Sequence, residues 1–257
     1  MTPGTDPDYP QMAAARGRVE PCPRRVRGFA GVRLLFDTTG ALYVWELPYY
    51  PQYYIPLADV HTEHLLDENH SQRVQFGPSR LYSISGTAAD ERAARVFDAD
   101  GDGPVAGFVR FEWDSVQWFE EDEPIVVHPR NPYTRVDALR SHRHVTVELD
   151  GTVLADTNSP VLLFETGLPT RYYLDRTDVV FDHLVASDTE TTCPYKGTTS
   201  GYWSVRVGDE VRPDLAWTYQ SPLPAVAGIT GLVAFYNEKV DITVDGVALP
   251  RPTTHFT

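Results

Sequence analysis

The sequence predicts a mainly β protein with short helices, built as two tandem small antiparallel β domains related by internal duplication. Three observations support this prediction: apolar and polar residues alternate over short runs, tight-turn dipeptides separate those runs, and the two halves of the chain resemble each other. A period of two puts apolar side chains on one face of a strand. With 257 residues, 42% of them hydrophobic, the chain can fill two ordinary cores.

The duplication is visible when residues 25–65 are aligned on residues 144–184, a shift of about 119 residues that needs no gap. Further along, "LYSI" (81–84) lies near "YWSV" (202–205), and "PVAGFVRFEW" (104–113) resembles "PAVAGITGLVAFY" (224–236). Chance is a poor explanation for a match of this length. The identical pairs include Asp37/Asp156, Thr38/Thr157, Glu46/Glu165, Tyr53/Tyr172, Tyr54/Tyr173, Asp59/Asp178 and His64/His183.

The strand signals are clearest in the second copy. "HVTVELDGTVLAD" predicts a hairpin that turns at Asp150-Gly151, because this dipeptide accepts positive φ. "PVLLFET" and "TRYYL" predict further strands, and "YWSVRVGDEV" and "DITVDGVAL" predict hairpins that turn at Gly208-Asp209 and Asp245-Gly246. Only "PLPAVAGITGLV" has helical spacing, so we expect one or two short helices per copy.

The repeat boundaries predict four segments. We expect an extended leader over residues 1–24, a first, degenerate repeat over 25–118, a connector over 119–143 and a second repeat over 144–257. The connector prediction rests on an acidic run and three prolines in "FEEDEPIVVHPRNPYTRVDALRSHR". We expect the second repeat to carry the functional site.

Composition excludes several classes of partner. A net charge of −14 argues against nucleic acid, because phosphate binding needs a clustered basic face. The N-terminal residues lack the apolar run of a signal peptide, and no stretch has the roughly 18 apolar residues of a membrane span. Cys22 and Cys193 form neither a disulfide framework nor a paired zinc motif. We therefore expect a cytoplasmic monomer or homodimer with reduced thiols, no membrane partner and a small-molecule ligand.

Four stretches carry a family resemblance: "DGTVLADTNSPVLLFETGLPTRYYL", "DTETTCPYKGTTSGYWSVRVG", "AWTYQSPLPAVAGITGLVAFYNEKVD" and the connector. In this order they resemble the family called domain of unknown function 427, in the tandem form typical of actinobacteria-like sequences. The resemblance implies a small β-rich domain, similar to β-tent folds in which two sheets lean over a pocket. An old family label, nucleotidyltransferase-like, lacks support because the sequence has no P-loop, no paired acidic metal ligands and no basic cradle. We expect no cofactor.

The sequence "CPYKG" marks the main candidate for chemistry. Cys193 and Lys196 occur only in the second copy, since the aligned stretch of the first is "VQFG" (74–77). An ammonium group close to a thiol favours the nucleophilic thiolate, so Cys193 is a candidate nucleophile and Lys196 its activator. In the alternative reading, Cys193 packs as a small apolar group, Pro194 starts a turn and Lys196 is solvated.

Glu165 and His183 are weaker catalytic candidates. Glu165 shares a strand face with apolar residues, which suits acid–base work, and His183 is a candidate base. Both have twins in the first copy, Glu46 and His64, so a structural role is an open alternative for each. The histidines His61, His64 and His70 do not follow a metal-ligand pattern, so we expect no metal site.

Aromatic residues are dense in the second copy. Most fill a thin β core, but some would line a flat apolar pocket for a small organic ligand. The candidates for that pocket are Tyr173, Tyr195, Trp203, Trp217 and Tyr236.

Together these features predict a cofactor-independent enzyme that acts on a small organic metabolite, with the Cys193/Lys196 pair at the rim of an aromatic pocket. Hydrolase or lyase-type chemistry, by acid–base or thiol catalysis, fits these residues best. The alternative is a small-molecule-binding or sensing module without turnover. The sequence does not choose between them.

Overall fold

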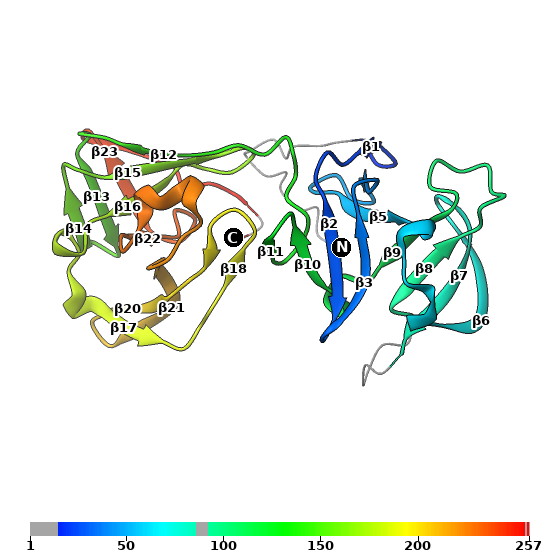
Figure 1. The fold of residues 1–257 in the computed structure, drawn as a ribbon. Coiled ribbons are helices and arrows are strands. Elements are labelled where there is room, and N and C mark those ends of the chain that lie inside the picture. Colours follow the sequence, from blue (N-terminus) through cyan, green and yellow to red (C-terminus); the bar gives the residue numbers. More distant parts are fainter. Residues whose placement is uncertain (1–14, 86–91, 255, 257) are drawn as a thin grey trace, which may run out of the picture. The chain divides into compact units, whose positions relative to one another are not determined.

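The computed structural model describes residues 15–85, 92–254 and 256. The chain divides into two compact units, and the boundary lies between Asn131 and Pro132. In the described residues, each unit contains one seven-stranded and one four-stranded sheet, and every strand pair within them is antiparallel (Figure 1). The predicted mainly β fold in two tandem domains is therefore confirmed.

The two units repeat the same strand order, which confirms the duplication. The first unit has a sheet of β1 (Val19–Pro21), β4 (Leu42–Val44), β5 (Gln52–Pro56), β9 (Phe108–Phe111), β8 (Ala94–Phe97), β7 (Gly77–Ile84) and β6 (Leu65–Val74), and a sheet of β11 (Glu123–Ile125), β10 (Gln117–Glu120), β2 (Val26–Ala30) and β3 (Arg33–Thr38). The second has β12 (Val136–Arg140), β15 (Val161–Glu165), β16 (Arg171–Leu174), β22 (Val233–Phe235), β21 (Glu210–Thr218), β20 (Gly201–Val207) and β17 (Leu184–Ser187), with β14 (Thr152–Thr157), β13 (Val145–Leu149), β23 (Asp241–Val244) and β24 (Val247–Ala248).

Local turn chemistry sets the hairpins as the sequence predicts. Asp150 and Gly151 both have positive φ, 50° and 78°, which lets a two-residue turn follow the twist of β13 and β14. The register of this hairpin shifts after Val147, and the twin hairpin β2–β3 shifts after Gly28. The bulge therefore belongs to the common fold.

Each core lies between the two sheets of its unit. In the second unit it joins Val145 of β13 to Phe235 of β22, and Leu154 is fully buried, as is its twin Leu35 in the first unit. Burial of side chains of this size contributes about 1.5–3 kcal/mol each.

The paired tyrosines that the repeats share fill both faces of the seven-stranded sheet. Tyr172 packs in the core between the sheets, whereas Tyr173 belongs to a second apolar cluster on the other face, because neighbouring residues of a strand point to opposite sides. Tyr53 and Tyr54 divide in the same way in the first unit.

Short 3₁₀ helices link the strands. They are η1 (Leu57–Asp59), η2 (Thr62–His64), η3 (Trp113–Ser115), η4 (Arg176–Asp178), η5 (Phe181–His183) and η6 (Pro224–Ile229). The stretch "PLPAVAGITGLV" forms η6, which is shorter than its apolar spacing suggests and is kinked at Val226 (φ −124°). Gly228 and the β-branched residues that follow it do not favour a longer helix. Within the described residues, none of these helices has the length and apolar character needed to cross a bilayer.

The segments outside the predicted repeats also build the sheets. Residues 119–143 were expected to connect the domains, but β10 and β11 belong to the first unit and β12 is an edge strand of the second. Part of the expected leader is likewise ordered: β1 pairs with β4, and Cys22 is buried in the first core. The first 14 residues of that leader lie outside the described residues.

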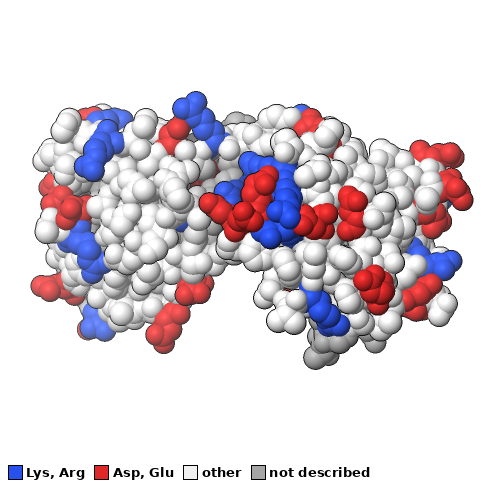
Figure 2. Space-filling model, viewed as in Figure 1, with Lys and Arg blue, Asp and Glu red and all other residues white. Residues whose placement is uncertain are grey.

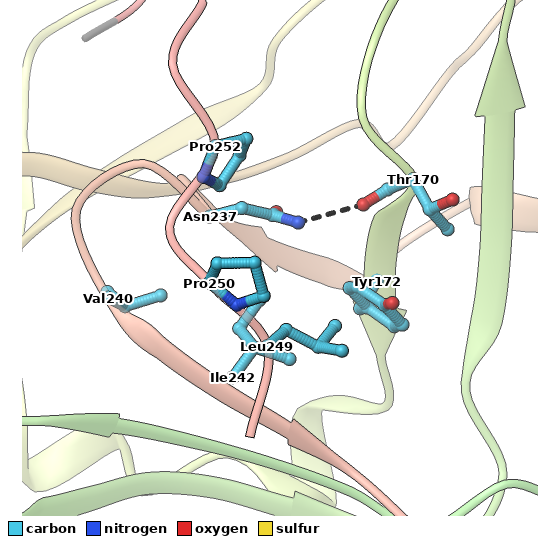
Figure 3. A pocket seen from close by; sticks show the side chains of 8 residues that line it. All are labelled: Thr170, Tyr172, Asn237, Val240, Ile242, Leu249, Pro250 and Pro252. Carbon is cyan, nitrogen blue, oxygen red and sulfur yellow. Dashed lines mark hydrogen bonds between the residues drawn. The ribbon is translucent and has the colours of Figure 1, made fainter. Parts of the chain in front are cut away.

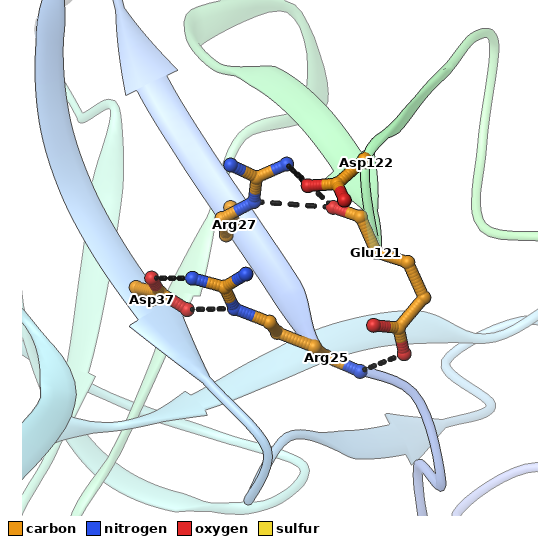
Figure 4. A network of polar contacts seen from close by, with 5 residues as sticks. All are labelled: Arg25, Arg27, Asp37, Glu121 and Asp122. Carbon is orange, nitrogen blue, oxygen red and sulfur yellow. Dashed lines mark hydrogen bonds and ion pairs between the residues drawn. The ribbon is translucent and has the colours of Figure 1, made fainter.

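Charged side chains pair on the four-stranded sheet of the first unit (Figure 4). Arg25 forms a bidentate ion pair with Asp37, and Arg27 donates to Asp122 and to the backbone oxygen of Glu121 at 2.8 and 2.6 Å. On the face drawn in Figure 2, basic and acidic side chains lie next to one another. Arg27 therefore holds the β10–β11 turn against β2, and Arg25 joins the start of β2 to β3.

Candidate functional site

The sequence "CPYKG" forms a hairpin that the second unit adds to the common fold. It lies between β17 and β20 and consists of β18 (Thr192–Cys193) and β19 (Gly197–Thr198), with Pro194, Tyr195 and Lys196 in the turn. In the first unit, residues 75–76 alone join the corresponding strands β6 and β7. The backbone N–H of Leu223, just before η6, donates to the Lys196 oxygen at 3.0 Å and ties the turn to the sheet face.

Lys196 forms an ion pair with Glu165 beneath this turn. Its Nζ lies 2.5 Å from Glu165 Oε2, and the two side chains are only 13% and 8% exposed. Burial by itself would lower the pKa of Lys196, but the Glu165 carboxylate, together with Cys193 and Tyr173, raises the pKa above its ordinary value. Lys196 is therefore an ammonium group at neutral pH. Among the described residues its Nζ donates one hydrogen bond, so two N–H groups remain for a ligand.

The first unit pairs the twin carboxylate with a different cation. Glu46 accepts a hydrogen bond from Tyr54 at 2.9 Å and forms an ion pair with Arg110 Nε at 3.1 Å. Strand register places Arg110 opposite Tyr54, and Ala234 occupies the equivalent position in the second unit. The second unit has thus lost the sheet arginine and supplies a lysine from the added hairpin instead.

Cys193 is half-buried at the base of the turn, close enough to Lys196, Tyr173 and Tyr219 to influence their ionisation. Burial raises the pKa of Tyr173 to about 12, opposed by the nearby Lys196 ammonium, and Tyr173 Oη accepts a hydrogen bond from Trp217 Nε1 at 3.2 Å. Burial also raises the pKa of Tyr219. The structure therefore brings together Cys193, Lys196, Glu165 and neutral phenols.

The predicted aromatic residues divide between the two faces of the sheet. Trp217 and Tyr236 pack with ring centres 4.5 Å apart, and the hydroxyls of Tyr236 and Tyr202 lie 2.7 Å apart. Trp203 follows Tyr202 in β20 and so points to the opposite face, where it packs edge-on against Phe181. Trp203 does not join the other predicted ligand-binding residues. Tyr195 lies half-buried in the turn itself.

His183 also lies apart from this cluster. Its Nδ1 contacts the backbone oxygen of Arg206 at 3.1 Å, and no contact joins it to Lys196, Glu165 or Cys193 among the described residues. His183 therefore contacts the backbone near the end of β20 and does not contact Lys196 in the described part of the chain. In the part of the chain that the structure describes, no three His, Cys, Asp or Glu side chains are placed to hold a metal ion.

A pocket of about 130 Å³ lies elsewhere in the second unit (Figure 3). It lies on the Tyr172 side of β16, whereas Tyr173 on the other face is part of the Lys196 cluster. None of the catalytic or ligand-binding residues predicted from the sequence lines it. The lining residues are Thr170, Tyr172, Asn237, Val240, Ile242, Leu249, Pro250 and Pro252.

Comparison with known proteins gives one family. The model of the domain of unknown function (DUF427) matches residues 18–121 and 137–246, one match for each unit. No curated protein matches the chain significantly. The two matched segments begin and end close to the first and last strands of the two sheet pairs.

Proposed function

Because the chain belongs to the family of domain of unknown function 427 and carries two copies of that domain, we propose that they have diverged in role. The second copy acts as a cofactor-independent enzyme on a small organic metabolite, and the first serves as a scaffold. One observation carries this proposal. The largely buried ammonium group of Lys196 has N–H donors that no described residue uses, and it lies near Cys193. The aligned stretch of the first copy, residues 74–77, has neither a cysteine nor a lysine.

The proposed chemistry uses Cys193 as the nucleophile. Its thiolate would add to an electrophilic carbonyl carbon, forming an S–C bond while the carbonyl π electrons move to oxygen. Lys196 would donate a hydrogen bond to that oxygen, since preorganised donors stabilise developing negative charge. Glu165 is a positioning residue that holds Lys196 charged and oriented. A hydrolase or lyase-type reaction is consistent with these roles.

Thiol reactivity tests the proposal without knowledge of the substrate. In a Cys22→Ala background, only Cys193 reacts with iodoacetamide, and we expect Lys196→Met to slow alkylation at pH 7 by about tenfold. His183→Ala is the matched control because His183 does not contact the cluster, and it should leave the rate unchanged. Equal rates with and without Lys196, or labelling only after unfolding, would refute activation of the thiol.

Turnover is tested with a panel of small carbonyl metabolites. Product formation should be lost in Cys193→Ala and strongly reduced in Lys196→Met, while ligand affinity is retained in both.

We also propose a cytoplasmic location, which the two free cysteines support, because unpaired thiols persist in a reducing compartment.

A binding or sensing module without turnover is the second candidate. The observation that favours it is the tight internal bonding of the aromatic cluster, in which Trp217 contacts Tyr236 and donates to Tyr173. Such a rigid face suits recognition. Loss of ligand binding on Trp217→Ala, with no product from any ligand that binds, would favour this function over catalysis.

A further inference from the structure

We propose that Tyr219 is a further catalytic residue of the Lys196 cluster, and that its phenol hydroxyl binds the oxygen of a substrate carbonyl group beside Cys193. This inference rests on the proposed function, in which the Cys193 thiolate attacks the carbonyl carbon. It adds a second hydrogen-bond donor to the one that Lys196 supplies. The substrates of the site are then small carbonyl compounds whose oxygen accepts two hydrogen bonds.

The first unit carries a phenylalanine at the position of Tyr219. β21 pairs with β22 as β8 pairs with β9, and Ala216 and Ala94 each pair with the phenylalanine that ends the neighbouring strand. Tyr219 and Phe97 are each the third residue after that alanine. The first unit therefore fills this position with the same ring but without the hydroxyl.

The two rings are almost equally buried. Phe97 is 2% exposed and lies against Tyr54 with ring centres 5.5 Å apart. Tyr219 is 4% exposed and belongs to the apolar cluster that contains Tyr173, the twin of Tyr54. Packing at this position thus needs only the ring, and the hydroxyl of Tyr219 is an addition that the common fold does not require.

The hydroxyl of Tyr219 makes no hydrogen bond to any described residue. The other phenols of the same cluster differ in this respect, because the hydroxyls of Tyr202 and Tyr236 bond to each other and that of Tyr173 accepts from Trp217. A buried polar group without a hydrogen bond costs free energy. A ligand oxygen would supply the partner that the fold does not.

Backbone contacts place Tyr219 beside the hairpin that carries Cys193. Tyr219 directly follows β21, whose last residue, Thr218, pairs with Gly201. The segment that comes next lies against the hairpin, because Ser221 O is 3.7 Å from the position that a Cβ atom of Gly197 would take. The ring is therefore anchored next to the turn that is found in the second unit.

Cys193 lies within electrostatic reach of both proposed donors. Burial is the main cause of the raised pKa of Tyr219, and Tyr173 and Cys193 raise this pKa further. Cys193 also acts on the pKa of Lys196. The phenol is therefore protonated at neutral pH and can donate a hydrogen bond. An ammonium group and a phenol near the attacking sulfur form a pair of donors of the kind that stabilises an oxyanion.

The test uses propanal labelled with ¹³C at the carbonyl carbon as the probe, and the full chain with Cys22→Ala. The Cys193 sulfur forms an S–C bond with the carbonyl carbon, and the thiol proton ends on the carbonyl oxygen, which gives a thiohemiacetal. ¹³C NMR measures the dissociation constant of this adduct, and loss of the signal in Cys193→Ala assigns it to the thiol.

Tyr219→Phe restores the first unit's residue and should weaken the propanal adduct by about tenfold. The rate of iodoacetamide alkylation at pH 7 should be unchanged, because attack on the iodomethyl carbon places no charge on oxygen. Tyr202→Phe is the matched control, since it also removes a buried hydroxyl from the cluster, but one that is bonded to Tyr236. It should leave the affinity for propanal unchanged.

Urea unfolding gives a readout that a merely structural hydroxyl would move. Because no described residue bonds to it, its loss in Tyr219→Phe should leave the urea midpoint unchanged or raise it. A lower midpoint would show that the fold itself uses the hydroxyl and would overturn the proposal.

Equal propanal affinity with and without the Tyr219 hydroxyl, or the absence of a saturable adduct in the parent chain, would also overturn the proposal. Iodoacetamide rates that do not depend on Lys196 would instead count against the proposed activation of the thiol. The adduct is compared at equilibrium and does not require that activation, so failure of one proposal is distinct from failure of the other.

Discussion

The duplicated glutamate has a cationic partner in both copies, but the partner and the exposure of the carboxylate differ. Glu165 ends β15, is 8% exposed and pairs with Lys196 of the added turn, whereas Glu46 lies two residues beyond β4, is 30% exposed and pairs with Arg110 of β9. The more buried carboxylate of Glu165 has the greater need of a cation, because unpaired buried charges are costly. The glutamate therefore needs a positively charged partner, but that partner can be an arginine or a lysine and can come from a different element in each copy.

Removal of either partner of the Lys196–Glu165 pair should destabilise the second unit. We expect Glu165→Gln or Lys196→Met alone to lower the free energy of unfolding by about 3 kcal/mol, because each leaves a buried group unpaired. The double variant should lose less than the sum of the two. Urea unfolding measures this coupling, and strictly additive losses would show that the pair does not act as a unit.

Ionisation of Tyr173 should make stability depend on alkaline pH. Its pKa is raised to about 12, so between pH 10 and that value the unfolded chain loses the phenolic proton and the folded chain keeps it. The folded state then binds more protons, and stability falls as pH rises. Tyr173→Phe should flatten this slope by up to about 1.4 kcal/mol per pH unit, measured by urea unfolding between pH 9.5 and 12. An unchanged slope would contradict burial of a neutral phenol.

At the scale of elements, the added hairpin depends on one residue that favours a special backbone conformation. Gly197 has a φ of +95°, which side chains rarely tolerate, and it pairs with Cys193 directly after the turn. The segment around Leu223 lies against it, within 4 Å of the position that a Cβ atom would take. The hairpin is therefore fixed by its backbone as well as by the lysine beneath it.

Gly197→Ala should strain this turn and loosen its contacts. We expect a loss of about 1–2 kcal/mol in stability and faster amide hydrogen exchange in residues 191–199. Gly151→Ala is a matched control, because it also has positive φ (78°) but open space around the missing Cβ. It should cost stability without changing exchange in the β18–β19 hairpin.

Local signals in the sequence are sufficient to predict the strands and turns, but they are not sufficient to predict which residues meet at the candidate site. The Asp150-Gly151 and Asp245-Gly246 turns follow from the conformations that these residues tolerate, and the alternation fixes the faces of β13. The Lys196–Glu165 contact joins residues 31 apart in sequence. Trp203 was predicted to line a pocket with Trp217 and Tyr236, but the alternation in β20 puts its side chain on the other face of the sheet, against Phe181.

At the scale of the whole molecule, the chain contains two hydrophobic cores, and both are built between the same two kinds of sheet. Each core fills the space between a seven-stranded and a four-stranded sheet, and equivalent leucines, Leu35 and Leu154, are completely buried in both. The two cores share this design but not all their residues: buried Phe36 and Tyr43 of the first align with buried Ala155 and Leu162 of the second. The fold was predictable because duplication doubles each local signal, whereas the Cys193/Lys196 hairpin is found in the second copy alone among the described residues.

Equivalent core substitutions should separate the stabilities of the two units. Leu35→Ala should increase hydrogen exchange mainly in residues 19–125, and Leu154→Ala mainly in residues 136–248, each with a loss of about 2–5 kcal/mol in its own unit. Hydrogen exchange detected by mass spectrometry distinguishes the two halves. Equal effects of both variants throughout the chain would show that the units unfold as one.

Each unit carries one thiol, and the two differ in access. Cys22 is 3% exposed within the first core, whereas Cys193 is half-buried at the base of a turn. A thiol-specific dye would therefore modify Cys193 first, and the delayed modification of Cys22 would mark the opening of the first unit. The chain thus contains a natural reporter of that opening, and no label has to be introduced by mutation.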